Sequence, residues 1–232
     1  MDRSFGRLAE AYPLDPNTER FTAAGVYDKV AGLVVLALVT AAAGYALASP
    51  GQVLLAIVIA FAVGIAGTFR PRWARWTAPA YALIEGFALG GISGWYAKIA
   101  GGIIPLAVLF TGAVFVAALV AFRTGLVKVT PKFVSITMMA TFGLMVVYIA
   151  ALLGLRLPGI ADLGPRGVIF GVIGLAIGVM NLFVDFQYVE TAQERGYSAE
   201  GEWFAAYAMM ASLVLVYINV LRILASAYGR RR

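Results

Sequence analysis

The chain alternates long apolar runs with short polar segments, and this pattern predicts a bundle of membrane helices. Seven runs are long enough to cross a bilayer as helices, which takes about 20 residues each. The fold class that we expect is therefore an all-α integral membrane protein with a seven-helix transmembrane bundle in one domain. The expected spans are roughly 30–48, 53–69, 78–96, 103–122, 133–153, 167–190 and 203–225.

Polar segments flank the predicted spans at both ends of the chain. We expect an N-terminal tail over residues 1–25, a transmembrane domain over residues 26–226 and a basic C-terminal tail over residues 227–232. Residues 22–29 are expected to form a short helix along the membrane surface. Lysine and arginine are more frequent in the N-terminal tail and the loops on its side, so the N-terminus is predicted to be cytoplasmic. With seven spans the C-terminus is then predicted to lie outside, although the three arginines at the end of the chain favour the cytoplasm.

Composition narrows the possible functions. Hydrophobic residues make up 62% of the chain and charged residues 13%, which excludes a soluble domain. Cysteine and histidine are both absent, so thiol chemistry, the usual general base and the usual transition-metal ligand are missing. The net charge of +6 fits the bias of membrane proteins toward positive cytoplasmic loops, and no base-reading motif indicates nucleic-acid binding. We expect neither an enzyme nor a cofactor.

The sixth predicted span carries one carboxylate on a face of small residues. Gly171, Gly178 and Asp185 are spaced by seven, so they lie on one side of a helix. A carboxylate within a span costs about 2.5–3.5 kcal/mol by insertion scales, and a glycine face allows a neighbouring helix to approach closely. We therefore expect Asp185 to point into the bundle and to act as a proton-sensitive gate. The alternative is a solvated charge at the cytoplasmic rim.

Other polar residues within the spans are candidate partners of that carboxylate. Glu85 lies about a third of the way into the third span, where it is either functional or bonded to a neighbouring helix. Ser212, Asn219 and Ser226 are spaced by seven and form one polar face of the last span. Asn219 and Arg222 suit a carboxylate or free carbonyl groups, although Arg222 could instead extend to the membrane surface.

The loop after the sixth span is acidic. Gly196 is expected to end the preceding helix, because glycine is common just past a helix end. Acidic side chains at a pore mouth would concentrate cations, and a solvated loop without a role is the alternative. The acids here are Glu190, Glu194, Glu200 and Glu202, of which Glu190 and Glu194 are the candidates for a pore mouth.

A second set of polar residues lies on one face of the fifth span. Thr137, Thr141 and Tyr148 share that face. They form either a polar seam toward other helices or bonds back to carbonyl groups of their own helix.

Four segments resemble the Bax inhibitor-1/YccA family of membrane proteins. NLFVDFQ in span six and YINVLRILA in span seven are the more specific ones, while RPRWARW and YALIEGFALGGISGWY are similar to the actinobacterial branch. The resemblance runs from about residue 22 to about residue 226. It implies seven helices with the last one central, a pH-sensitive calcium leak, and a link to stress or cell-death control.

The resemblance also implies a gate made of two aspartates that share a proton. Asp185 matches the aspartate of span six, whereas Ser212 stands where the family has its second aspartate. A serine can hydrogen-bond to a carboxylate but cannot form a coupled titrating pair with it. Either the proton switch is altered here or Glu85 supplies the missing acid. The resemblance further implies a span-two arginine that can pair with the acid of span six, and it corresponds to Arg70 or Arg72.

The function that we predict is a pH-sensitive passive calcium or cation leak channel in the inner membrane of a bacterium. Asp185, Glu85 and Ser212 would form the gate, with Asp185 and Glu85 as weak, transient calcium ligands. The alternatives are a non-transporting regulator that binds a membrane protein such as a protease, and a proton-coupled cation exchanger. The expected partners are the lipid bilayer, calcium and protons, and the chain is expected to be a monomer or a small homo-oligomer.

Overall fold

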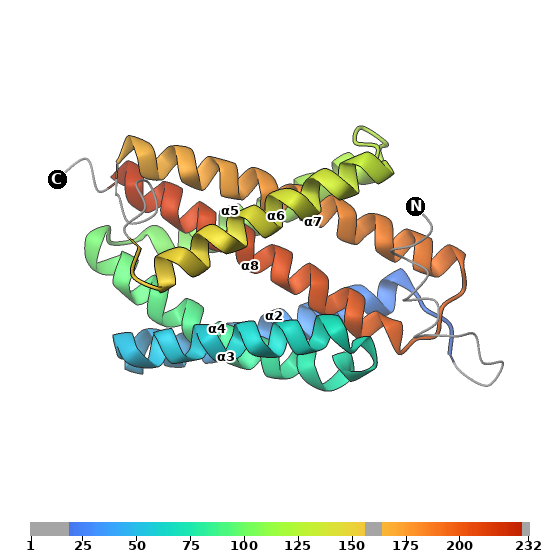
Figure 1. Cartoon of the computed structure of the whole chain (residues 1–232), viewed down its shortest axis with the longest axis horizontal. Coiled ribbons are helices and arrows are strands. Elements are labelled where there is room, and N and C mark those ends of the chain that lie inside the picture. The colour runs from blue at the N-terminus through green and yellow to red at the C-terminus, as the bar shows by residue number, and fades with distance from the viewer. Residues whose placement is uncertain (1–18, 156–163, 229–232) are drawn as a thin grey trace. The chain divides into compact units, whose positions relative to one another are not determined.

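A computed structural model describes residues 19–155 and 164–228, and their regular structure is helical (Figure 1). The helices of these ranges are α2 Ala23–Leu47, α3 Pro50–Phe69, the short 3-10 helix η1 Pro71–Trp73, α4 Ala74–Ile99, α5 Ile103–Arg123, α6 Pro131–Leu152, α7 Pro165–Glu194 and α8 Gly201–Tyr228. Each predicted span coincides with one α-helix, and apart from the start of α2 the ends agree within about one helical turn.

The start of α2 differs from the prediction. Residues 22–29 do not form a separate helix, because α2 runs without a break from Ala23 to Leu47. Thr22 is its N-cap, and the Thr22 side chain accepts a hydrogen bond of 3.0 Å from the Gly25 N–H. A capping hydroxyl satisfies one of the free N–H groups at a helix start, so a single long helix can begin here.

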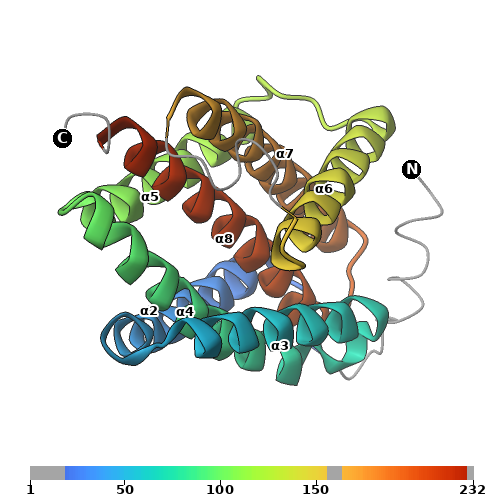
Figure 2. The ribbon, with the colours of Figure 1, turned by 60° about the vertical axis from the view of Figure 1, so that its left-hand side comes forward.

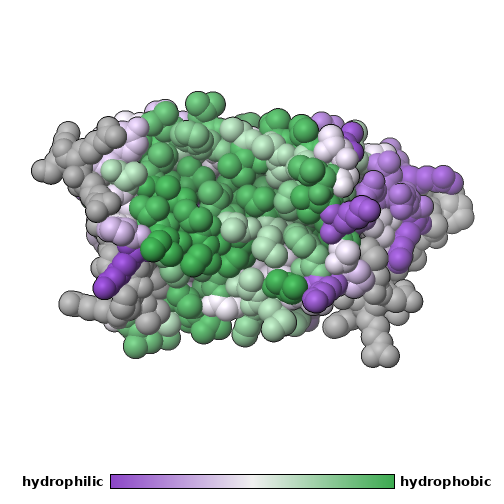
Figure 3. Space-filling model, turned by 90° about the horizontal axis from the view of Figure 1, so that it is seen from above, coloured by the Kyte–Doolittle hydropathy of each residue, from purple (hydrophilic) through white to green (hydrophobic). Residues whose placement is uncertain are grey.

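Six of the described helices are long and apolar enough to cross a membrane. The remaining long helix, α4, carries Arg75, Glu85 and Lys98 among its apolar residues. Large hydrophobic side chains stay exposed on these helices, as at Val39, which is 65% exposed, and Met139, which is 75% exposed. Hydrophobic residues also cover most of the face that Figure 3 shows. Exposed apolar surface of this extent is expected where helices face lipid, so the chain is an all-α membrane protein.

The chain divides into two compact units, and α4, α7 and α8 each contribute to both. The first unit contains residues 1–94 and 187–210, with α2, α3, most of α4, the end of α7 and the start of α8. The second contains residues 95–186 and 211–232, with α5, α6, most of α7 and most of α8.

In the first unit, α4 packs against α2 through glycines. A Cβ atom added at Gly86 would collide with the backbone of Ala37, and one added at Gly90 would collide with the backbone of Ala41. The two helix backbones are therefore in contact, as the spacing of these glycines predicts.

In the second unit α7 runs beside α8 (Figure 2), and the glycine face of α7 packs against α8. The side chains that fill the space beside it are Ile223, Asn219 and Val216, which lie against Gly171, Gly174 and Gly178 respectively. This contact sets the rotation of α7 about its own axis. Asp185 lies on the same face, two helical turns after Gly178.

Candidate functional site

Asp185 on α7 and Ser212 on α8 meet in the second unit. The Ser212 hydroxyl donates a hydrogen bond of 2.5 Å to Oδ2 of Asp185. Ser212 is buried, and Asp185 is partly buried. A hydroxyl that donates to a carboxylate at this distance makes a charge-assisted bond, which is stronger than a bond between neutral groups. The two positions that the resemblance pairs are therefore in direct contact, with a hydroxyl where the resemblance implies a second carboxyl.

Aromatic rings hold this turn of α7 against α5. The ring of Phe186, next to Asp185, lies 5.6 Å from the ring of Phe115 and 5.7 Å from the ring of Phe122. Rings at such distances pack favourably edge to face or tilted. These contacts hold the turn of α7 that carries Asp185 against α5, and Ser212 is the polar neighbour of the Asp185 carboxylate.

A second carboxylate is missing from this unit within its described residues. Asp185 is the one acidic side chain among residues 95–155, 164–186 and 211–228. A pair of carboxylates that shares a proton therefore cannot form inside this part of the molecule. What remains is one titratable group with a hydroxyl partner.

A further polar contact joins α7 to α6 one helical turn before Asp185. The Asn181 side-chain amide donates a hydrogen bond of 2.7 Å to the Thr141 hydroxyl and one of 2.9 Å to the Ile177 carbonyl. Thr137 instead bonds back to the Phe133 carbonyl at 2.9 Å. Thr141 therefore bonds toward another helix and Thr137 bonds back to its own helix, so each of the two alternatives is correct for one residue. Asn181 was not among the predicted site residues, although its place four residues before Asp185 indicates the same helix face.

The predicted polar face of α8 continues with Asn219 and Arg222, and neither contacts the Asp185 carboxylate. Asn219 is fully buried, occupies the space that Gly174 leaves open, and accepts a hydrogen bond of 3.2 Å from the Tyr148 hydroxyl. The guanidinium of Arg222 lies over the rings of Tyr148 and Phe170, at 5.5 Å and 4.9 Å from their centroids. Arg222 is 6% exposed, so it does not extend to the surface.

Glu85 lies on α4 in the first unit and is partly buried. It interacts electrostatically with Tyr81, one turn earlier on α4, and with Tyr207 on α8. The rings of these two tyrosines meet edge to face at 5.1 Å. A role for Glu85 as the missing second acid of the gate stays a prediction.

A comparison with protein-family models decides the family. The model described as Bax inhibitor 1 like matches residues 5–229. The chain belongs to the Bax inhibitor 1 like family. No curated protein matched the chain. The family match includes α7 and α8, the two helices that the Asp185–Ser212 contact joins. Ser212 therefore lies within the part of the chain that matches the family.

In this Bax inhibitor 1 like protein the arginines after α3 lie among tryptophans. Arg70 is the C-cap of α3, and its guanidinium lies 4.5 Å from the ring centroid of Trp73. Arg72 follows within η1, and both arginines are exposed. Exposed arginines beside tryptophans are typical of the membrane boundary. A pairing of either one with the acid of α7 stays a prediction.

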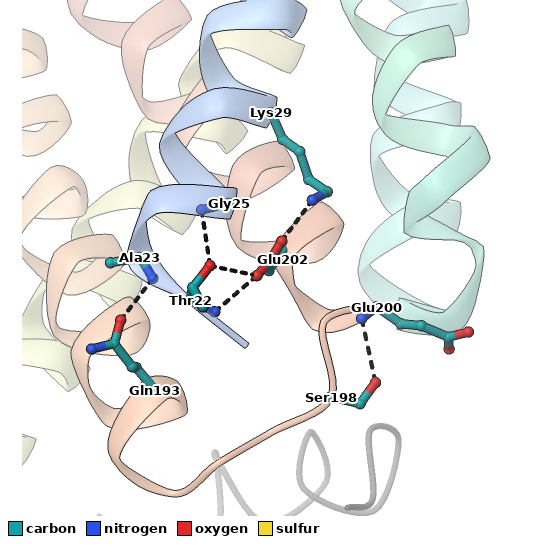
Figure 4. Close-up of polar contacts among 8 residues, drawn as sticks. All are labelled: Thr22, Ala23, Gly25, Lys29, Gln193, Ser198, Glu200 and Glu202. Carbon is teal, nitrogen blue, oxygen red and sulfur yellow. Dashed lines mark hydrogen bonds and ion pairs between the residues drawn. The ribbon is translucent and has the colours of Figure 1, made fainter. Parts of the chain in front are cut away.

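The acids of the predicted pore mouth fall into two kinds. Glu190 and Glu194 are exposed near the end of α7, so they remain candidates. Glu202 is 4% exposed and serves a structural role instead (Figure 4). Its carboxylate accepts hydrogen bonds from the Thr22 N–H at 2.8 Å and the Thr22 hydroxyl at 3.0 Å, and pairs with the Lys29 ammonium at 2.6 Å. The grouping of Glu202 with the solvated loop acids is therefore wrong.

The start of α2 is also bonded to the end of α7 and to the loop between α7 and α8. The Phe21 N–H donates to the Tyr197 carbonyl at 2.7 Å, and the Ala23 N–H donates to the Gln193 side chain at 2.7 Å. Gly196 ends α7 with a φ of 66°, as expected of a helix-terminating glycine. The end of α7 and this loop thus fix the position of the start of α2.

The described residues hold no group of three or more aspartate, glutamate, histidine or cysteine side chains that could bind a metal ion. Calcium bound tightly by a protein usually has six to eight oxygen ligands. The carboxylates of the candidate site, Asp185 and Glu85, are single groups in different units.

Proposed function

We propose that this Bax inhibitor 1 like protein is a passive cation leak, with calcium as the permeant ion, in the inner membrane of a bacterium. In this proposal all seven long helices cross the membrane, α8 is the central one and the N-terminus is cytoplasmic. The observation that carries the gate is the 2.5 Å hydrogen bond from Ser212 to Asp185, which joins α7 to α8. The family match supports the membrane setting.

The gate would close when Asp185 is ionised. An ionised carboxylate accepts the Ser212 hydroxyl in a charge-assisted bond worth about 1.5–3 kcal/mol, whereas a bond between neutral groups is worth about 0.5–1.5 kcal/mol. Protonation of Asp185 would weaken the contact between α7 and α8 and open the leak. The leak should therefore rise as pH falls, with one proton per gate, because a lone carboxylate titrates as a single site.

Conduction requires an ion to bind and leave quickly. A single carboxylate with hydroxyl, amide and carbonyl oxygens would bind calcium weakly. Weak binding fits a protein that conducts calcium better than one that stores it. The alternative of a regulator that binds a partner through glycine faces is disfavoured. The glycine faces of α4 and α7 are already occupied by α2 and α8 of the same chain.

The test is calcium uptake by liposomes that hold the purified full chain, measured from mildly acidic to mildly alkaline pH without a counter-ion gradient. Wild type should take up calcium faster at acidic pH. Asp185→Asn should change the rate and remove its pH dependence, because the titrating group is gone. Glu85→Gln shows whether a second acid contributes.

Three outcomes separate the possibilities. No uptake above empty liposomes at any pH would overturn the leak. Uptake that requires an opposing proton or sodium gradient would indicate an exchanger. Uptake with an unchanged pH profile in Asp185→Asn would keep the leak and remove Asp185 as its gate.

A further inference from the structure

The buried guanidinium of Arg222 has hydrogen-bond donors without acceptors. Its Nε and Nη1 atoms are buried and have no hydrogen-bond partner among the described residues. These two atoms carry three N–H groups, and a buried donor that stays unpaired costs about 1–3 kcal/mol, more when it is charged. The side chain of Tyr148 is one hydrogen-bond partner of the guanidinium. Stacking on Tyr148 and Phe170 orients the group further, and Nε and Nη1 still have no acceptor among the described residues.

Ser226 adds a fourth donor on the same face. It lies four residues after Arg222 on α8, is 1% exposed, and its hydroxyl has no hydrogen-bond partner among the described residues. Six other side-chain hydroxyls within helices of this chain bond back to a carbonyl four residues earlier. Such bonds form at Thr40, Thr68, Thr77, Thr111, Ser135 and Thr137. The Ser226 hydroxyl is therefore available to a ligand.

The second unit also has more basic than acidic side chains among its described residues, which favours an anion near Arg222. Its described residues contain one acid, Asp185, which is bonded to Ser212. Ser212 precedes Arg222 by ten residues on α8, which is about 15 Å along the helix axis. The basic side chains of the same ranges are Lys98, Arg123, Lys128, Lys132, Arg166 and Arg222. A buried cation without a nearby carboxylate is costly in a membrane protein unless another anion compensates it.

We propose that Arg222 and Ser226 form a binding site for a phosphate group, supplied either by the headgroup of an anionic phospholipid or by free phosphate. The guanidinium suits phosphate geometry, and the four donors match the several lone pairs of phosphate oxygens. Phe170 lies five residues from the first residue of α7, so the positive end of that helix dipole is roughly 8 Å away along the axis. Arg222 is six residues from the end of α8, about 9 Å, which places it near headgroup depth in a spanning helix.

The test uses the purified full chain in a neutral detergent. One arm measures the midpoint of thermal unfolding in potassium phosphate and in potassium chloride of equal ionic strength. The other arm counts bound phosphatidylglycerol and phosphatidylcholine by native mass spectrometry. Stabilisation by phosphate indicates a site open to free ions, and retention of phosphatidylglycerol alone indicates a headgroup site.

The variants separate this site from general attraction of a basic protein for anions. Arg222→Gln should weaken the apparent affinity at least about tenfold, and Ser226→Ala about fivefold. Arg123→Gln is the matched control, because Arg123 is an exposed arginine of the same unit at the end of α5, and it should bind like wild type. If Arg222→Gln does not fold, Arg222→Lys replaces it, and it should bind more weakly than wild type because lysine lacks the guanidinium fork.

Three results would overturn the proposal. The first is a response to phosphate and phosphatidylglycerol no greater than that to chloride and phosphatidylcholine. The second is equal binding by wild type and the variants of Arg222 and Ser226. The third concerns Asp162, which lies outside the described residues. If wild type ignores phosphate and Asp162→Asn gains the response, the chain itself provides the anion.

Discussion

Removing the Ser212 hydroxyl is expected to open the proposed leak at neutral pH while leaving Asp185 in place. Ser212→Ala deletes the donor of the 2.5 Å hydrogen bond to the Asp185 carboxylate. With Asp185 ionised the loss is about 1.5–3 kcal/mol, or about 10-fold to about 150-fold in the balance of closed and open states. With Asp185 protonated the loss is about 0.5–1.5 kcal/mol, or about 2-fold to about 12-fold.

The sign of the pH effect follows from these two values. The substitution destabilises the closed state more at neutral pH than at acidic pH. The leak of the variant should therefore be faster than that of wild type at every pH, and its rate should depend less on pH. Ser212→Asp should do the opposite. Two carboxylates in contact titrate as a coupled pair, so this variant should show a pH profile that involves two protons.

The assay is the initial rate of calcium uptake by liposomes, with the amount of inserted protein measured for each variant. Ser135→Ala is the control for the loss of a serine hydroxyl, since the Ser135 hydroxyl bonds only to the Pro131 carbonyl at 3.0 Å on its own helix. The control should match wild type. The reasoning is refuted if Ser212→Ala and wild type show the same rates and the same pH profile at equal insertion.

Three further predictions concern stability, each measured as a thermal unfolding midpoint. Glu202→Gln should destabilise the chain by about 1–3 kcal/mol, because it leaves a partly buried lysine unpaired, while exposed Glu200→Gln should have no effect. Gly174→Ala should cost about 1–3 kcal/mol, because the added Cβ would collide with the buried asparagine of α8, whereas Gly112→Ala has open space and should be neutral. Gly196→Ala should cost about 1 kcal/mol, because the φ of 66° strains any residue with a Cβ. Destabilisation of the two controls to the same degree would contradict the first two arguments, and an unchanged midpoint for Gly196→Ala would contradict the third.

The helices and their ends could be predicted because they depend on local properties of the chain. The length of an apolar run determines whether it can span a bilayer, and a glycine after the run determines where the helix stops, as at Gly196. Helical periodicity also placed Gly171, Gly178 and Asp185 on one face before any neighbour was known. These inferences need only the geometry of a single helix.

The partners of these faces were decided by the tertiary structure. Whether Ser212 reaches Asp185, and whether Thr141 rather than Thr137 bonds to another helix, depends on the rotation and register of two packed helices. Glu202 is separated from Thr22 by 180 residues, so its burial under the start of α2 follows from the folded arrangement of distant segments. Periodicity determines which side chains share a face, and only packing between helices determines what that face meets.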